Sequence, residues 1–303
     1  MLITALAGFL IATAACATGS AATWVEQVQA WRATREADLR KPDGWLAVSG
    51  LHFLPAGITT VGAAPTADLQ LPAGSAPPQA GRFISEAGHV RFEAAAGVHV
   101  TLNGQAITGP VPMSLADAKS ARPADRLQIG RISLLLHQSG TRLAVRLRDP
   151  ESPYRTNFTG LRWFPIDKAW RIPGRLIRYE TPRHIDVQNI LGDSEPMISP
   201  GEVEAVIDGT PVRLAAVQAA RGRLWLIFSD ATASDLTYRV RFLYTDAPDA
   251  DGAVDLDFNR AYNPPCAFNP HTTCPLPPRQ NRLPVRITAG EQQYSGHTQT
   301  TAN

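Results

Sequence analysis

Short apolar runs, broken at regular intervals by Gly and Pro, fill the chain from about residue 45 to residue 150. Runs of four to six residues between such turns are typical of β-strands. The turn Asn103-Gly104 is a strong hairpin signal between two of these runs, because both residues tolerate positive φ. We therefore expect a β-sandwich over residues 45–150, with strands at 45–48, 57–61, 67–71, 81–85, 89–94, 98–102, 125–129, 132–137 and 143–147.

Longer apolar runs follow the Pro-containing segment 149–153 and predict a second antiparallel β domain over residues 151–291. Its strands are expected at 169–172, 176–179, 185–189, 201–207, 210–218, 224–229, 238–244 and 253–257, with a last strand at 283–288. A Pro-rich segment, 259–284, contains Cys266 and Cys274 and is expected to be an ordered loop. The predicted fold class is all-β.

One helix is expected before the sandwich, within residues 23–44. Thr23 and Glu26 have the spacing of a capping box, and Trp24, Val28, Trp31 and Leu39 approximate an apolar stripe at helical spacing. Such a stripe predicts that the helix packs on a domain. Residues 292–303 are polar, and we expect a disordered tail there.

Residues 1–22 are expected to be a signal or lipoprotein leader, because 2–15 is apolar, uncharged and too short to span a bilayer. Small residues before Cys16 resemble a lipobox, while 19–21 also suits ordinary signal peptidase. Either route predicts an exported protein, periplasmic or lipid-anchored, whose membrane contact is a lipid on Cys16. The oligomeric state stays open.

Composition narrows the possible partners. The chain is 44% hydrophobic and 18% charged, with 25 Pro and 23 Gly, and its net charge is +2 without basic runs. These values fit a β-rich globular protein and give no indication of nucleic-acid binding. No cofactor is expected, since the chain lacks the phosphate-binding, dinucleotide-binding and metalloprotease motifs.

Cys266 and Cys274 stand eight positions apart, and in an exported protein the first expectation is a disulfide that closes the Pro-rich loop. Two alternatives stay open. One is a cysteine nucleophile activated by His271 or an Arg. The other is a metal site formed by both cysteines, His271 and Asp257, although the spacing lacks the paired pattern of structural zinc sites, and no metal is expected.

Polar residues at predicted strand ends are the candidates for a ligand site. Arginine forks bind carboxylates and phosphates, and the uncharged groups nearby add donors. The alternative is that these residues form structural ion pairs and satisfy turns. The candidate ligand-binding residues are Arg146, Arg148, Asp149, Arg241, Tyr238, Asn259 and Asn263; the catalytic candidates are Cys266, Tyr262 and Asp230.

Several motifs resemble those of a family of bacterial and archaeal proteins known as domain of unknown function 1684. They are residues 44–54 (GWLAVSGLHFL), Arg146-Leu147-Arg148-Asp149 with Pro153, Trp163-Phe164-Pro165, and above all residues 257–270 (DFNRAYNPPCAFNP), continuing to 274–278 and 281–283. The resemblance spans nearly the whole mature chain. It implies no established activity.

The N-terminal unit also resembles a forkhead-associated sandwich, through the order of Gly62-Ala63, the Ser75 loop and Asn103-Gly104. The Arg and His that such a domain uses for phosphothreonine are missing, so we expect a degenerate scaffold that does not bind phosphopeptides.

Together these features predict an exported envelope protein that binds a small or polymeric ligand in a polar cleft between two β units. Two alternatives are a hydrolase or transferase that uses the same cleft, and a structural or assembly lipoprotein.

Overall fold

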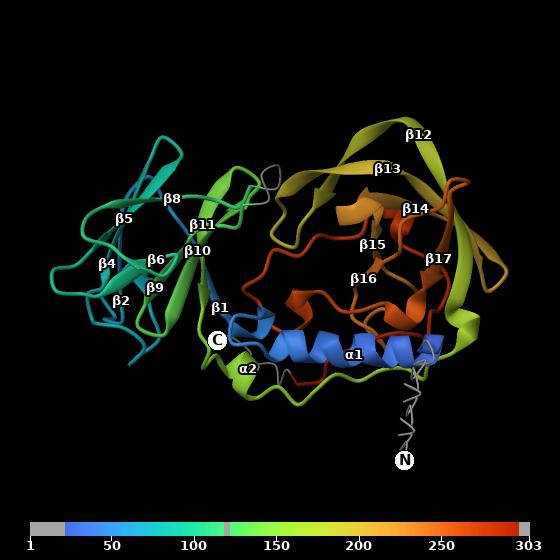
Figure 1. Ribbon diagram of the computed structural model, residues 1–303, viewed down its shortest axis with the longest axis horizontal. Coiled ribbons are helices and arrows are strands. Elements are labelled where there is room, and N and C mark those ends of the chain that lie inside the picture. Colours follow the sequence, from blue (N-terminus) through green and yellow to red (C-terminus); the bar gives the residue numbers. More distant parts are fainter. Residues whose placement is uncertain (1–21, 118–121, 297–303) are drawn as a thin grey trace, which may run out of the picture.

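A computed structural model describes residues 22–117 and 122–296. Two β units stand side by side, and one long helix runs beneath the second (Figure 1). The predicted all-β class with a single N-terminal helix is confirmed. Residues 1–21 of the expected leader, including Cys16, and the last seven residues of the expected tail lie outside the described residues.

The N-terminal unit is a sandwich of two sheets. The six-stranded sheet has the order β1-β11-β10-β9-β6-β7, and the five-stranded sheet has the order β3-β2-β4-β5-β8. Their apolar faces enclose one core, in which the rings of Phe83 and Phe92 meet edge to face at 5.1 Å. The strands are β1 (Val48–Phe53), β2 (Gly57–Gly62), β3 (Leu69–Gln70), β4 (Gly81–Glu86), β5 (His89–Ala94), β6 (Val100–Leu102), β7 (Gln105–Ala106), β8 (Val111–Met113), β9 (Arg126–Ile129), β10 (Ile132–Ser139) and β11 (Arg142–Arg148).

The hairpin predicted at Asn103-Gly104 is confirmed, since it joins β6 to β7 with φ of 51° and 84° at the two residues. The strand predicted at 45–48 is wrong. Trp45–Ala47 forms a 3₁₀ turn, η1, and the strand begins at Val48. Leu46 and Ala47 are buried because η1 packs against α1 and α2 (Pro153–Thr156) rather than because they join a sheet.

The second unit contains one six-stranded antiparallel sheet of order β16-β15-β14-β13-β12-β17. Its core lies between this sheet and the segment 283–289. The strands are β12 (Arg171–Gln188), β13 (Ser194–Ile207), β14 (Thr210–Gln218), β15 (Leu224–Phe228), β16 (Arg241–Tyr244) and β17 (Ala253–Asp257), with short 3₁₀ turns η2 (Lys168–Trp170), η3 (Ala220–Gly222), η4 (Phe258–Arg260), η5 (Pro265–Ala267) and η6 (Arg279–Asn281).

Two predictions in this unit need correction. The runs 169–172, 176–179 and 185–189 are largely one strand, β12, because an irregularity in its pairing with β13 between Arg178 and Arg183 accommodates Pro182. The strand predicted at 283–288 is not formed. Leu283 and Val285 make single backbone hydrogen bonds to Ser229 and Ala231, and Pro284 has no N–H to continue a ladder.

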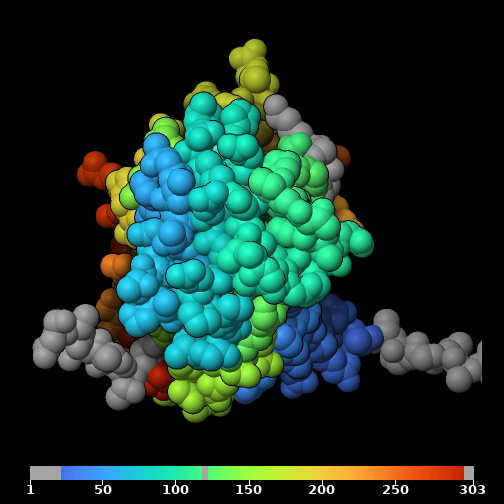
Figure 2. All heavy atoms as spheres, turned by 90° about the vertical axis from the view of Figure 1, so that its left-hand side faces the viewer, coloured from blue at the N-terminus to red at the C-terminus, as the bar shows by residue number. Residues whose placement is uncertain are grey.

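The β12–β13 hairpin reaches across to the sandwich. Asn189 Nδ2 donates to Ser139 Oγ (2.8 Å), Ser139 donates to Asp193 (2.6 Å), and Arg142 pairs with Asp193 at 2.5 Å. In Figure 2, seen from the sandwich side, atoms with the colour of the β12 region project above the sandwich. The hairpin tip and the β10–β11 turn therefore fasten the two units at one end.

Helix α1 (Trp24–Arg40) begins with the predicted capping box, in which Thr23 and Glu26 each accept from the other's backbone N–H. Val28 and Leu39 are buried, while Trp24 and Trp31 are half-buried. The helix is held to the second unit mainly by polar bonds: Arg32 donates to the Phe164 and Asn259 carbonyls. Within the described residues, no helix is long and apolar enough to cross a bilayer.

Candidate functional site

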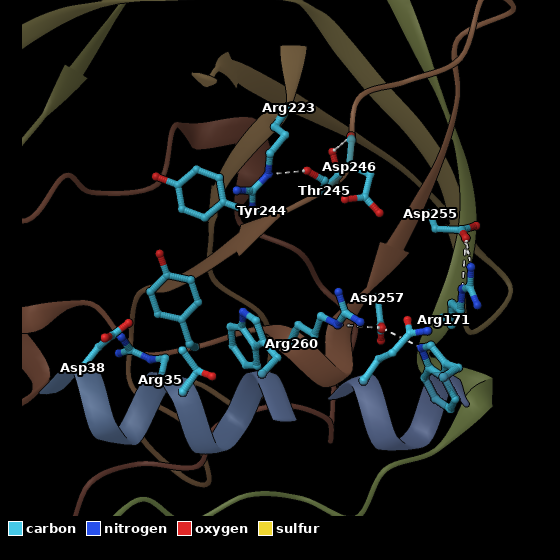
Figure 3. A pocket seen from close by; sticks show the side chains of 15 residues that line it. Arg35, Asp38, Arg171, Arg223, Tyr244, Thr245, Asp246, Asp255, Asp257 and Arg260 are labelled. Carbon is cyan, nitrogen blue, oxygen red and sulfur yellow. Dashed lines mark hydrogen bonds and ion pairs between the residues drawn. The ribbon is translucent and has the colours of Figure 1, made fainter. Parts of the chain in front are cut away.

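A pocket of about 410 Å³ lies between α1 and the open end of the second β unit (Figure 3). We call it the α1 pocket. One wall is a face of α1, and the others come from β12, the residue before β15, the end of β16 with the two residues after it, β17, η4 and Tyr262. Its lining residues are Trp24, Gln27, Trp31, Thr34, Arg35, Asp38, Arg171, Arg223, Tyr244, Thr245, Asp246, Asp255, Asp257, Arg260 and Tyr262.

Aromatic rings form one side of the α1 pocket. Tyr244 and Tyr262 are nearly parallel, with ring centroids 6.4 Å apart and an interplanar angle of 15°. Trp31 lies 6.1 Å from Tyr262. Trp225 stacks on Tyr244 from behind, at 5.7 Å. This ladder fixes the rings and presents flat apolar surface to the pocket.

The charged residues of the pocket are balanced, with four arginines and four aspartates. Several are paired: Arg171 with Asp255 at 2.5 Å, and Arg260 with Asp257 at 3.5 Å. Asp257 also accepts from Trp24 Nε1 at 2.9 Å. A pocket with equal numbers of both signs gives no strong preference for an anion or a cation.

Arg35 is positioned by a buried acid. Its Nε lies 3.2 Å from Glu291, whose side chain is 1% exposed, and its Nη2 donates to the Asn263 carbonyl at 2.7 Å. The guanidinium then lies over the ring of Tyr262, 4.3 Å from the centroid. Burial raises the pKa of Glu291, an effect that Arg35 opposes.

Three polar groups in the pocket have no partner among the described residues: the hydroxyls of Tyr244 and Tyr262 and the carboxylate of Asp246. In Figure 3 Asp246 and Tyr244 lie above α1, on the opposite wall from Arg35. Burial, helped by nearby Tyr244, raises the pKa of Tyr262. Burial likewise raises the pKa of Tyr244. Both phenols are therefore protonated donors at neutral pH.

Of the predicted ligand-binding and catalytic residues, the structure brings only Tyr262 into this pocket; Asp257, the aspartate of the metal alternative, lines it too. Arg241 and Asp230 instead form a fully buried ion pair of 2.8 Å in the second core, and Arg241 also donates to the carbonyls of Ile287 and Ala289. Asp230 accepts in addition from Thr232. Both side chains are fully buried, so this ion pair stabilises the core and is not available to a ligand.

Four other candidates also form hydrogen bonds or ion pairs with other residues of the protein. Asp149 is 3% exposed and receives both Nε and Nη2 of Arg131, at 2.9 and 3.1 Å. Tyr238 donates to the Cys266 carbonyl at 3.3 Å. Asn259 and Asn263 are fully buried, and their amide groups donate to the Asp167 and Gln292 carbonyls.

Arg146 and Arg148 differ from the other candidates, because neither has a carboxylate within ion-pair distance in the described part of the chain. Both lie on the outer face of β11. Arg146 packs over the ring of Trp45, at 5.2 Å, and donates weakly to Thr273 Oγ1 at 3.4 Å. Burial, together with Arg148, lowers the pKa of Arg146 to about 10.

The expected disulfide is not formed. Cys266 and Cys274 are free thiols, although they are neighbours: the Cys266 N–H donates to Cys274 Sγ at 3.1 Å. The metal alternative is not supported, because no group of three His, Cys, Asp or Glu side chains in residues 22–117 and 122–296 is arranged to hold an ion. His271 instead packs edge to face on Tyr154, at 5.9 Å.

A second pocket, of about 340 Å³, lies where the C-terminal loop meets the sandwich and is lined by β1, residues 70–73, Leu147 and His271. Its polar side chains are Ser49, His52, Gln70 and His271. The α1 pocket is richer in hydrogen-bonding groups, so we take it as the candidate site.

Sequence reasoning missed the α1 face of the pocket. Its side chains follow helical spacing: Trp24, Gln27, Trp31, Arg35 and Asp38. Aromatic and charged residues at this spacing form a second face of the helix, beside the apolar positions Val28 and Leu39. That spacing is the sequence signal for a helical face that does not pack into a core. The residues on the opposite wall carried no comparable signal, because their proximity depends on the sheet.

Comparisons with known proteins identify relatives without naming an activity. The chain is similar to an uncharacterised protein of Haloarcula marismortui, with 32% identity over 49% of this chain and 83% of that one, and a TM-score of 0.39. It is also similar to the FHA-2 domain of a Mycobacterium tuberculosis ABC transporter (20% identity, 31% of this chain, 77% of that chain, TM-score 0.24) and to the FhaA FHA domain (11%, 32%, 97% and 0.23). No curated protein gives a significant match.

The family model described as "Protein of unknown function (DUF1684)" matches residues 156–292, which include β12 to β17 and the motif around Tyr262 and Cys266. On this match, residues 156–292, slightly less than half of the chain, belong to the DUF1684 family of proteins of unknown function.

Proposed function

We propose that the protein binds a neutral, ring-shaped polyhydroxyl ligand, a saccharide, in the α1 pocket. The observation that carries this proposal is the combination of flat aromatic surface with unpartnered donors and acceptors in one pocket. Tyr244 and Tyr262 offer free hydroxyls, and Asp246 offers a free carboxylate. A sugar has apolar ring faces and hydroxyls that both donate and accept, so it can use all of these groups at once.

The charge balance of the pocket supports a neutral ligand. Asp246 and Asp255 disfavour an anion, and Arg223 and Arg260 disfavour a cation. The pocket is open to solvent, so it admits either a free sugar or the terminal unit of a polysaccharide.

The pocket supports binding better than catalysis. Of the catalytic candidates, Tyr262 alone lines it, and its raised pKa makes the phenol a hydrogen-bond donor rather than a nucleophile. Asp230 is held in a buried ion pair, and Cys266 belongs to another part of the molecule.

A thermal-shift and calorimetry panel tests the proposal, with glucose, N-acetylglucosamine, a disaccharide and a soluble polysaccharide as probes. A saccharide that binds the folded state raises stability, by about 2.7 kcal/mol at one hundred times its Kd. Binding of the monosaccharides indicates a free sugar, and binding of the polymer alone indicates a terminal unit. A response to inorganic phosphate alone, or to none of the sugars, contradicts the proposal.

Two variants locate the site. Asp246→Ala should weaken binding about tenfold or more, because it removes a charged acceptor, and Tyr244→Phe should weaken it less. Asp251→Ala is the matched control, since this exposed aspartate lies on the neighbouring loop outside the pocket. If Asp246→Ala and Tyr244→Phe bind the saccharide as tightly as the control Asp251→Ala, the saccharide does not bind in the α1 pocket.

We also propose that the protein is exported, which rests on the apolar leader at residues 2–15 and the lipobox-like sequence before Cys16. Cell fractionation of the wild type and of Cys16→Ala tests both export and the lipidation of Cys16. Loss of membrane association in the variant supports lipidation, and recovery of the wild type in the cytoplasm contradicts export.

A further inference from the structure

Two free thiols meet where the C-terminal loop passes between the two β units. Cys266 lies in η5, and Cys274 directly precedes Pro275, which bridges to Asn189 at the hairpin tip. The Cys266 N–H donates to Cys274 Sγ at 3.1 Å, which places the two cysteines side by side. The pair is therefore assembled before any oxidation takes place.

The loop is fixed on both sides of this pair. The Cys274 carbonyl accepts from the Ile190 N–H at 3.0 Å, and the Cys266 carbonyl accepts from the Tyr238 hydroxyl at 3.3 Å. Pro264 and Pro265 restrict the backbone before Cys266. The two sulfur atoms are held in proximity by the fold itself rather than by a covalent link.

The surroundings of Cys274 favour its thiolate. Its side chain is 4% exposed, and besides the Cys266 N–H the Thr272 hydroxyl lies 3.5 Å from the sulfur. Burial alone would raise the pKa of Cys274, but these hydrogen bonds and the charge of Arg146 outweigh it and lower the pKa. Arg146 contacts the adjacent Thr273 and forms no ion pair with a carboxylate in the described part of the chain; the negative groups that act on it are Cys274 and, beside it, Glu195.

Cys266 has the opposite character. Cys266 is half-buried as a residue, whereas Cys274 is buried. The interaction of the Cys266 thiol with Cys274, reinforced by burial, raises the pKa of Cys266. One sulfur that attacks and a second that remains protonated until needed are the two parts of a redox-active dithiol.

We propose that Cys266 and Cys274 are a redox-active dithiol, with Cys274 as the attacking thiolate, Cys266 as the resolving thiol and a small peroxide as the oxidant. The Cys274 sulfur attacks one oxygen of hydrogen peroxide, the O–O bond breaks, and hydroxide leaves, which gives a sulfenic acid. Cys266 then loses its proton and attacks the Cys274 sulfur, the S–O bond breaks, and water leaves. Two thiols and one peroxide become one disulfide and two waters.

The first test oxidises the reduced full chain with hydrogen peroxide and measures its mass and free thiols after unfolding. The wild type should lose both thiols and form one intramolecular disulfide. Cys266→Ser should accumulate a sulfenic acid at Cys274 that a dimedone reagent traps, and Cys274→Ser should leave Cys266 unmodified. Retention of both thiols in the wild type, or first oxidation at Cys266, overturns the proposal.

The second test measures the thiolate directly, by ultraviolet absorbance against pH. Arg146→Gln should move the Cys274 transition to higher pH and slow oxidation about tenfold for each unit of displacement. Arg148→Gln is the matched control, because it removes the like charge two positions along the same strand. Thr272→Val gives a second, smaller displacement and remains informative if Arg146→Gln does not fold. Identical transitions in wild type, Arg146→Gln and Thr272→Val contradict the assignment of Cys274.

These measurements do not involve the α1 pocket. A negative result for saccharides and a positive result for peroxide, or the reverse, therefore separates the two proposals.

Discussion

The two β units bury different kinds of side chain. In the sandwich, the buried polar residues of 48–149 are five hydroxyls and one charge, Asp149, which pairs with Arg131; the hydroxyls are Thr59, Ser75, Ser85, Ser133 and Ser139. The second unit and its C-terminal segment bury charges and amides, among them Asp230, Arg241, Glu291 and Asn281. The sandwich is thus stabilised by sheet ladders and apolar packing, whereas the second unit also depends on side chains that bond to backbone.

The reason for this difference lies in the segment 258–292. It contains 3₁₀ turns and single bridges rather than strands, so its buried backbone groups need side-chain partners. Arg241 binds the Ile287 and Ala289 carbonyls, and Asn281 binds both the N–H and the C=O of Ala215. An irregular segment can thereby cover a core and still hold the residues of the α1 pocket.

Asp230→Ala should have the largest effect. It leaves the Arg241 charge buried without a partner, and we expect a loss of about 3–5 kcal/mol in the free energy of unfolding, measured by urea denaturation. Asp235→Ala, which breaks the exposed pair with Arg286, is the control and should cost at most about 1 kcal/mol. Equal losses of unfolding free energy in the two variants would show that the buried ion pair contributes no more to stability than the exposed one.

The double variant Asp230→Leu/Arg241→Met sharpens the same comparison. It removes both charges together, so it should be markedly less destabilising than Asp230→Ala. If the double variant is less stable to unfolding than Asp230→Ala, the hydrogen bonds of Arg241 to carbonyl groups, rather than its charge, hold the C-terminal segment.

Asn281→Ala should have an intermediate effect. Its side chain satisfies the Ala215 and Ile227 carbonyls and the Ala215 N–H, and leaving such groups unpaired costs about 1–3 kcal/mol. Gln280→Ala, at the exposed neighbouring position, should stay within about 0.5 kcal/mol of wild type in the same denaturation measurement. If the unfolding free energy of Asn281→Ala equals that of wild type, buried amides do not have the stabilising role assigned to them.

The smallest expected effect concerns the junction of the two units in acid. Burial, together with the charge of Arg146, lowers the pKa of His137 to about 4, and its Nε2 is hydrogen-bonded to Thr273 at 2.9 Å. The folded state therefore binds this proton less readily than the unfolded chain. The stability contributed by neutral His137 is present above pH 6.5 and lost as the pH falls towards 4.

His137→Gln should remove this part of the pH dependence, which is small because the ring is half-buried and partly screened by solvent. Unfolding free energies of wild type and variant at several pH values between 4 and 7 test it. Parallel curves would show that His137 does not titrate in this range.

Local features were predictable wherever a short segment determines its own conformation. The capping box of Thr23 and Glu26 and the turn at Asn103-Gly104 are confirmed, because each involves only neighbouring residues. The strand expected at 283–288 failed because its apolar residues are buried against a sheet without joining it. Apolar periodicity reports burial, and it does not report whether the backbone hydrogen bonds form a ladder.

The candidate site was predicted poorly for a related reason. Arg241 and Asp230 have the residue types of a binding site, yet they are an internal ion pair with no exposed surface. Tyr262 was the exception, and the aromatic face of α1 was overlooked because Trp24 and Trp31 were interpreted as packing residues.

The sequence by itself determined the fold class, the N-terminal helix and the kinship, because these depend on local patterns and on motifs that can be matched residue by residue. Only the tertiary structure decided that Arg35 and Asp38 of α1 face Tyr244 and Asp246, and that Cys274 lies beside Arg146. These partners are separated by more than one hundred residues, and their proximity follows from how the sheets and the C-terminal segment pack, which no local pattern encodes.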